Sequence, residues 1–244
     1  MTDARSLRRM QHLVRRDWTP GSHWHVGDLA WQSPSLDDRR VAIWADGWAW
    51  ADRENRLGLH VTPALIGDAL AWFDEVATGE QKCTAMETDT ALLAALTAAG
   101  YKPVDEPFFR HCLRELDDTL PAPELPPGYR VRATRPGEDA ERAAVHRAAW
   151  RPGAPDGTLV ASALGWYDDV NRTALLEPVG TDAEHARRGL GAAVSLACLR
   201  AMRDAGARLA VVCPRGDDAY PVPRQLYHRL GFRDAGRTVT YARD

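Results

Sequence analysis

One stretch in the C-terminal half of the chain joins an apolar run, a basic glycine turn and a helical pattern. The run from Leu175 to Asp182 has the pattern of a buried strand that contains Glu177 and Pro178 and ends in polar residues. Residues 186–193 follow three positions later, with two arginines and two glycines before an alanine-rich segment. The order predicts a strand, a turn and a helix, which is a building unit of α/β folds.

This order of elements creates an anion site at the start of the helix. The first amide N–H groups of a helix have no partner within it, and the helix dipole places partial positive charge there. Gly189 and Gly191 let the backbone come close to a bulky phosphate. Arg187 and Arg188 add positive charge beside it. The turn is therefore suited to a pyrophosphate.

Two common phosphate-binding turns do not fit this glycine pattern. A dinucleotide fingerprint needs a third glycine where this chain has Val194, and a P-loop needs a lysine after its last glycine, where this chain has Ala192. The stretch 186–191 instead resembles the pyrophosphate loop of the GNAT acyltransferase superfamily, Arg/Gln-x-x-Gly-x-Gly/Ala. It departs at the first position, Ala186, which affects one side-chain contact but not the backbone amides.

A second motif follows the glycine turn in the expected order. Residues 224–232 resemble the closing Leu-Tyr-x-x-x-Gly-Phe element of the same superfamily, and the apolar run 209–213 between the two motifs predicts a strand. In the superfamily the tyrosine of this element lies near the thioester sulfur and can protonate the leaving thiolate. The resemblance implies this role for Tyr227; the alternative is a core aromatic with its hydroxyl at the surface.

The resemblance also implies a cofactor and a reaction. The cofactor is acetyl-coenzyme A, or coenzyme A after the reaction, and the acetyl (acyl) group passes to a primary amine of a small molecule or peptide. The implied cofactor-binding residues are Val179, Thr181, Arg187, Arg188, Gly189, Leu190, Gly191 and Ala192. A non-catalytic acyl-coenzyme A sensor is the leading alternative, and a structural partner protein without a cofactor is a third.

Glu177 is the candidate for the base that accepts the proton of the amine. In many GNAT members a carboxylate in this region takes that proton through water. Glu177 lies two residues before Val179, and strand alternation predicts that the two share a face. Pro178 has no N–H and is expected to interrupt regular strand pairing there. A solvated or salt-bridged glutamate is the alternative.

A proline-rich segment divides the chain. Residues 120–128 hold four prolines and exclude a helix interior or a central strand, so they predict a linker between a domain of residues 1–119 and one of residues 129–244. After the linker, residues 129–133 alternate like a strand, and residues 138–150 have helical spacing.

The two sides of the linker look like diverged repeats. Residues 96–101 parallel 227–232, residues 57–63 parallel 175–182, and residues 109–114 and 238–241 are the matching last strands. We therefore expect an α/β fold with an α+β mixed sheet, arranged as two tandem GNAT-like domains. Turns are expected at Asp46-Gly47 and Asp156-Gly157, each with almost no strand before it.

The first repeat lacks the residues of the phosphate turn. Residues 64–70 replace it with one glycine and no arginine, and Asp68 would repel a phosphate. Leu96 stands where the second repeat has Tyr227. The N-terminal domain is therefore expected to bind no cofactor. Seven of the nine tryptophans precede the linker, and we expect them to fill the core of the N-terminal domain; the alternative is a flat aromatic wall for the acceptor.

Composition limits the other functions. A net charge of -3 gives no overall basic field for nucleic acid, and no apolar run approaches the roughly 20 residues of a membrane span. The four cysteines are scattered without a CxxC pair, so neither a metal site nor a disulfide framework is expected. The polar start 1–16 has no signal-peptide core, which favours the cytoplasm. Nothing in the sequence sets the oligomeric state.

Overall fold

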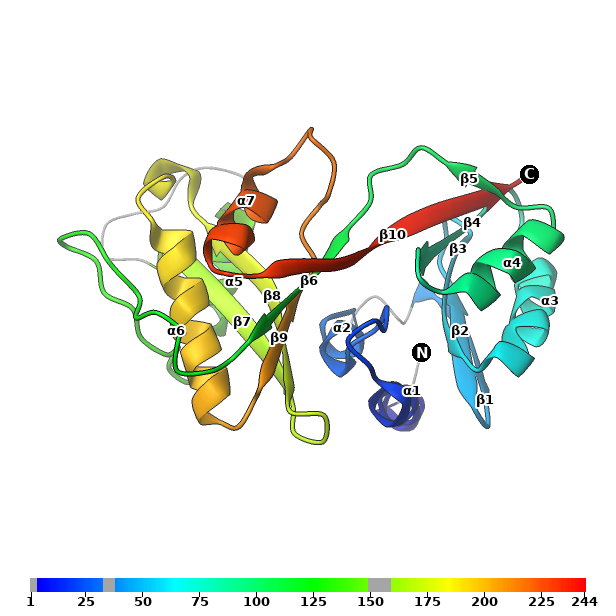
Figure 1. The fold of residues 1–244 in the computed structure, drawn as a ribbon, viewed down its shortest axis with the longest axis horizontal. Coiled ribbons are helices and arrows are strands. Elements are labelled where there is room, and N and C mark those ends of the chain that lie inside the picture. Colours follow the sequence, from blue (N-terminus) through cyan, green and yellow to red (C-terminus); the bar gives the residue numbers. More distant parts are fainter. Residues whose placement is uncertain (1–3, 33–37, 149–158) are drawn as a thin grey trace. The chain divides into compact units, whose positions relative to one another are not determined.

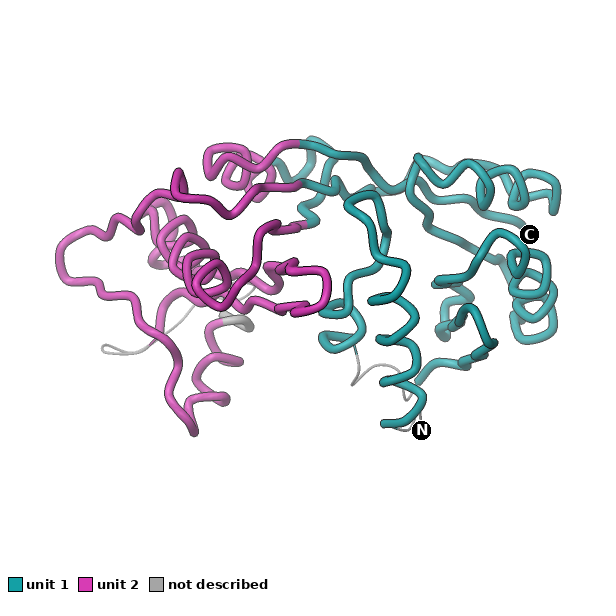
Figure 2. Tube along the Cα trace, turned by 60° about the horizontal axis from the view of Figure 1, so that its bottom comes forward, with its two compact units in different colours: residues 1–112, 213–221, 234–244 teal, residues 113–212, 222–233 magenta. Residues whose placement is uncertain are grey.

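The computed structural model describes residues 4–32, 38–148 and 159–244 (Figure 1). Trp150 and the turn expected at Asp156-Gly157 lie outside these ranges. The chain forms two compact units: unit 1 comprises residues 1–112, 213–221 and 234–244, and unit 2 comprises residues 113–212 and 222–233 (Figure 2). No helix in the described ranges is long and apolar enough to cross a membrane.

Unit 1 is a mixed sheet with helices on both faces. Its strands β1 to β3 pair antiparallel, β3 pairs parallel with β4, and β4 pairs antiparallel with β10, which in turn pairs with β5. The elements in chain order are α1 (Ala4–Asp17), α2 (Val26–Gln32), β1 (Arg40–Trp44), β2 (Gly47–Ala51), β3 (Arg56–Val61), the 3-10 helix η2 (Pro63–Leu65), α3 (Ile66–Val76), β4 (Gln81–Met86), α4 (Thr90–Ala98), β5 (Lys102–Val104), β6 (Arg110–Glu115) and β10 (Arg233–Arg243).

The prediction that the tryptophans fill the core of unit 1 holds for three of the seven: Trp24, Trp48 and Trp50 are buried, and the other four are only partly buried. All five residues of strand β2 are buried. Successive side chains of a strand point to opposite sides of the sheet, so both faces of β2 are covered. Trp48 and Trp50 join Trp24 and the apolar side of α1, whereas Ala49 and Ala51 join the core under α3 and α4. The ring centroid of Trp24 lies 5.4 Å from that of Trp48, in an edge-to-face contact.

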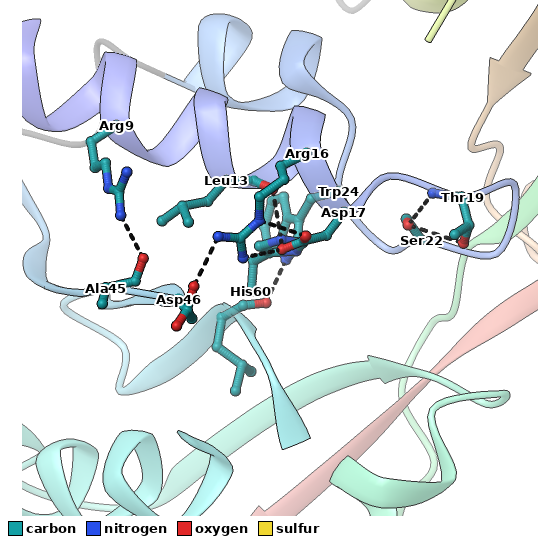
Figure 3. A network of polar contacts seen from close by, with 11 residues as sticks. Arg9, Leu13, Arg16, Asp17, Thr19, Ser22, Trp24, Ala45, Asp46 and His60 are labelled. Atoms are coloured by element: carbon teal, nitrogen blue, oxygen red, sulfur yellow. Dashed lines mark hydrogen bonds and ion pairs between the residues drawn. The ribbon is translucent and has the colours of Figure 1, made fainter. Parts of the chain in front are cut away.

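Helix α1 is tied to this sheet by polar contacts around its apolar side (Figure 3). Arg9 donates to the carbonyl of Ala45, and Arg16 pairs with Asp46 at 2.8 Å. On β3, His60 Nε2 lies 3.2 Å from the carbonyl oxygen of Leu13. These contacts fix the position of α1 over the tryptophans, where hydrophobic burial supplies most of the stabilisation.

Unit 2 has a smaller sheet with helices packed against it. Strand β8 pairs antiparallel with β7 and parallel with β9, and α6 packs against β7 and β8. Its elements in chain order, after the end of β6, are α5 (Asp139–Ala148), β7 (Ala161–Asp168), β8 (Thr173–Thr181), the 3-10 helix η3 (Ala183–His185), α6 (Leu190–Asp204), β9 (Leu209–Val212) and α7 (Val222–Arg229). This confirms the predicted mixed α/β class.

The two units repeat one order of elements. In each, an antiparallel strand pair is followed by a 3-10 helix, a long helix, a strand parallel to the second of the pair, and another helix. The units do not follow the linear division expected at the linker, because residues 234–244 belong to unit 1 and residues 120–128 to unit 2. Strand β10 pairs with β4 from Thr238↔Met86 to Arg243↔Gln81.

Two local expectations are wrong. Residues 129–133 form no strand, because Tyr129 N–H closes a turn onto Pro126 and Arg132 bonds to Glu138. The strand said to be nearly absent before Asp46-Gly47 exists: β1 pairs with β2 over five residues. The residues of β1, RVAIW, do not alternate between apolar and polar, so the alternation pattern did not reveal this strand.

Two glycines test the tryptophan core of unit 1. A Cβ on Gly58 would lie 2.3 Å from the ring of Trp50, whereas a Cβ on Gly67, in the first turn of α3, would meet nothing within 4 Å. We expect Gly58→Ala to destabilise the protein by about 1–3 kcal/mol through overpacking. Gly67→Ala should stabilise it by about 0.5 kcal/mol. Urea unfolding followed by tryptophan fluorescence measures both, and equal stability of the two variants would contradict this packing.

Candidate active site

The turn between β8 and α6 is built on two left-handed residues. Arg187 has a φ of 60° and Gly189 a φ of 78°, and α6 begins directly after Gly189. Gly189 provides no capping side chain, and the first bond inside the helix runs from Ala193 N–H to Gly189 oxygen. The amides of Leu190, Gly191 and Ala192 therefore have no partner within the helix. A Cβ on Gly189 would meet nothing within 4 Å.

The two arginines of the turn differ in their surroundings. Both are exposed. The guanidinium of Arg188 donates to the hydroxyl of Tyr129 at 2.6 Å and to the carbonyl of Glu184 at 3.2 Å. Among the residues that the structure describes, the Arg187 side chain makes no hydrogen bond or ion pair. Arg187 is thus the arginine whose donors are available to an anion.

A bulge interrupts the pairing of β7 and β8, as predicted for Pro178. Val179 lies opposite Ala163 and Leu176 opposite Gly165, so Glu177 and Pro178 together face one residue of β7. The extra residue corrects the prediction that Glu177 and Val179 share a face. Partners in an antiparallel pair lie on the same side, which puts Val179 with Leu176 and leaves Glu177 on the other side.

Glu177 is half-buried within this bulge, and burial raises the pKa of its carboxyl group above the usual value of 4.5. Its backbone carbonyl accepts a hydrogen bond of 2.7 Å from Trp166 Nε1 on β7. In the described ranges its carboxylate makes no ion pair or hydrogen bond, so no salt bridge of the kind considered for it is present there. A carboxylate with a raised pKa is a stronger base than a solvated one.

Tyr227 is held by the way that α7 ends. The N–H of Phe232 bonds to the carbonyl of Tyr227, the N–H of Gly231 bonds to that of His228, and Gly231 has a φ of 84°. This is a Schellman cap, in which the residues flanking the two bonds also pack together. The rings of Tyr227 and Phe232 meet edge to face at 5.7 Å, and Tyr227 is only 6% exposed.

Three sequence-predicted elements meet at Gly191. A Cβ placed there would lie 3.4 Å from Thr181 Oγ1 at the end of β8 and 3.6 Å from Leu226 Cδ2 on α7. Leu226 precedes Tyr227, so the end of β8, the glycine turn and the helix that carries the tyrosine come together in unit 2. Sequence reasoning missed Tyr129, whose hydroxyl binds this turn. Its contacts span 56 and 59 residues, and no local pattern signals them.

The corresponding part of unit 1 has the same frame without these groups. Helix α3 begins after Leu65, with neither a left-handed glycine nor an arginine there, and Asp68 lies in its first turn. Helix α4 ends in the same cap as α7, since Tyr101 N–H bonds to Leu96 oxygen and Gly100 has a φ of 86°. Leu96 thus occupies the place of Tyr227.

Solved structures share this fold at low sequence identity. A tandem GNAT protein from the clavulanic acid biosynthesis pathway superposes with a TM-score of 0.69 at 17% identity, over 97% of this chain and 93% of its own. A GCN5-related N-acetyltransferase from Kribbella flavida gives 0.60 at 21% identity, over 91% and 96%. One from Sphaerobacter thermophilus gives 0.61 at 20% identity, over 80% and 76%.

No curated protein sequence matches the chain. The family model of the acetyltransferase (GNAT) family matches residues 110–232, half of the chain. That range contains the bulged strand, the glycine turn and the capped tyrosine helix described above. The chain belongs to the acetyltransferase (GNAT) family.

Proposed function

We propose that the C-terminal repeat binds acetyl-coenzyme A and transfers its acetyl group to a primary amine of a small molecule or peptide. Acetyl-coenzyme A is the general cofactor of the GNAT family. The observation that carries the proposal is the meeting of β8, the phosphate turn and α7 at Gly191. The amides of Leu190, Gly191 and Ala192, with Arg187, would hold the pyrophosphate.

The residues of this chain fit the needs of acyl transfer. The amine nitrogen must be neutral to form its bond with the thioester carbonyl carbon, and Glu177 would accept the proton that it loses, through water. Backbone N–H groups beside the bulge at Val179 would polarise the carbonyl oxygen. The carbon–sulfur bond then breaks, and the Tyr227 hydroxyl would protonate the leaving thiolate.

We also propose a tandem arrangement in which the N-terminal repeat is free of cofactor. The shared order of elements and the shared helix caps support a duplication. The start of α3, with Asp68 and no arginine, supports the loss of phosphate binding. Calorimetry should therefore find one coenzyme A per chain, and two equivalent sites would contradict the proposal.

An assay of acetyl-coenzyme A consumption against a panel of primary amines tests the whole proposal. Turnover with at least one amine is the expected result. Binding of coenzyme A without turnover of any amine would favour the non-catalytic sensor. Neither binding nor turnover would overturn the proposal.

The phosphate turn can be tested by adding charge. We expect Gly189→Glu and Gly191→Glu to abolish coenzyme A binding in calorimetry, because the new side chain fills the phosphate position and repels it. Gly137→Glu is the matched control, since Gly137 has a φ of 87° and nothing within 4 Å of its Cβ position. It carries the same strain and charge as Gly189→Glu. Normal affinity in folded Gly189→Glu protein would remove the turn from the site.

The proton-donor role is tested by Tyr227→Phe. Removal of the hydroxyl alone should lower kcat by roughly a hundredfold or more, most strongly with poor leaving thiolates, and should change coenzyme A affinity little. Tyr167→Phe is the control: its hydroxyl makes no hydrogen bond within the described ranges. Full activity of Tyr227→Phe would assign the proton to water and Tyr227 to packing.

The base is tested by the pH dependence of kcat/KM. Because burial raises the pKa of Glu177, activity should fall as the pH drops through a pKa above 4.5. Glu177→Gln should lower kcat/KM by roughly a hundredfold and abolish this acidic limb. The neutral amide also removes the cost of a buried charge, so the free energy of unfolding at pH 8 should not decrease. An unchanged limb in Glu177→Gln would exclude Glu177 as the base.

A further inference from the structure

The proline-rich segment 120–128 is fastened at both ends within unit 2. At its start, the carbonyl of Leu120 accepts a hydrogen bond of 2.9 Å from Arg200 of α6. Arg203, one turn further along α6, donates to the carbonyl of Asp117 at 3.3 Å. At its end, Tyr129 contacts the turn before α6. The segment therefore links the far part of α6 to the turn at its start, about 15 Å away along the helix axis.

Tyr129 is the centre of a small network on the turn. Its hydroxyl accepts a hydrogen bond of 2.6 Å from Arg188 Nη1 and lies 2.7 Å from His185 Nδ1. Because the hydroxyl accepts from Arg188, its own hydrogen is available to Nδ1. The two rings also meet edge to face, with centroids 5.8 Å apart. Arg188 closes the network by donating to the carbonyl of Glu184.

This network separates the roles of two adjacent arginines. The guanidinium of Arg188 links the Tyr129 hydroxyl to the backbone of η3, so its donors are used within the protein. Arg187, in its left-handed conformation, is exposed and makes no hydrogen bond or ion pair to any residue that the structure describes. Loss of the Tyr129 hydroxyl would remove the bond to His185 Nδ1 and one of the two bonds of Arg188, and would so loosen the backbone that leads to Gly189.

We propose that Tyr129 is a positioning residue for the phosphate turn: it holds His185 and Arg188 so that the turn keeps its conformation, and leaves Arg187 to contact the phosphates. The proposal rests on the proposed function of this turn as a coenzyme A site. Tyr129 acts through Arg188 and His185 rather than on the ligand. It lies outside the matched glycine motif, at the end of a segment whose composition predicts only a linker.

Hydrogen exchange of the ligand-free protein tests the mechanical part. Tyr129→Phe keeps the ring and removes both hydrogen bonds, so the amides of His185 and Ala186, which bond to the carbonyls of Asp182 and Ala183, should exchange about tenfold faster. Arg188→Gln should do the same. Arg187→Gln and the control Tyr167→Phe should leave exchange in the turn unchanged. Unchanged exchange in Tyr129→Phe would overturn the proposal whether or not coenzyme A binds.

Calorimetry with two ligands tests the consequence for binding. Tyr129→Phe should weaken coenzyme A binding about tenfold and leave S-acetylpantetheine, which lacks the pyrophosphate, unaffected. The double variant Tyr129→Phe/Arg188→Gln should bind no more weakly than the weaker single variant, because both break one network. Arg187→Gln should add its own loss to that of Tyr129→Phe.

Three results would overturn the inference or its premise. Normal coenzyme A affinity in Tyr129→Phe would exclude a positioning role. An equal loss of affinity for coenzyme A and for S-acetylpantetheine in Tyr129→Phe would indicate a general structural defect, and Tyr129 would then have no specific effect on the turn. No binding of coenzyme A by the unaltered protein would refute the proposed function itself, and is distinguished from the other two because it needs no variant.

Discussion

The close seating of α6 on β7 and β8 is the constraint on which the candidate site depends. At Gly165 of β7 an added Cβ would lie 2.3 Å from Met202 and 2.8 Å from Cys198, so these two side chains of α6 pack directly against the strand backbone. The same closeness brings the first turn of α6 against Thr181. A helix held further away would leave its first amides apart from the end of β8, and a ligand could not contact both.

A comparison of the two repeats separates the features that form the fold from the side chains that differ between them. Both keep the left-handed glycine and the aromatic residue that end a helix, at Gly100-Tyr101 and Gly231-Phe232. The residue that the cap holds differs between the repeats: it is the fully buried Leu96 in the first repeat and Tyr227 in the second. A cap of this kind stabilises the helix end whatever side chain it holds. The same frame can therefore form with either a leucine or a tyrosine at this position.

Local sequence patterns predicted most of unit 2, because the elements that form its candidate site are close together in the sequence. The strand at 175–181, the turn and the start of α6 follow from apolar runs, glycines and charges within about 20 residues. The bulge was foreseen from Pro178, but not its effect on Glu177, because one extra residue reverses the alternation of faces. Residues 129–133 looked like a strand because alternation alone does not reveal that Arg132 pairs with Glu138.

Long-range pairings were beyond such patterns. The bond between Tyr129 and Arg188 depends on how the proline-rich segment lies along α6, and neither partner has a distinctive neighbourhood in sequence. The same holds for the division of the chain. The last strand reads as the end of the second repeat, yet the residues that pair with it lie in β4. Backbone hydrogen bonds carry this pairing, and they are available to almost any sequence.

The place of β10 has a consequence for synthesis of the protein on the ribosome. Met86 is made about 150 residues before its partner Thr238. At a usual elongation rate, roughly 8–30 s pass before the C-terminal strand can reach the edge of β4. During that time β4 presents unpaired backbone groups, of the kind that join strands of other chains. The N-terminal sheet of this protein is therefore completed only when the last strand has been made. A chain whose synthesis stops before residue 238 has an unpaired edge at β4.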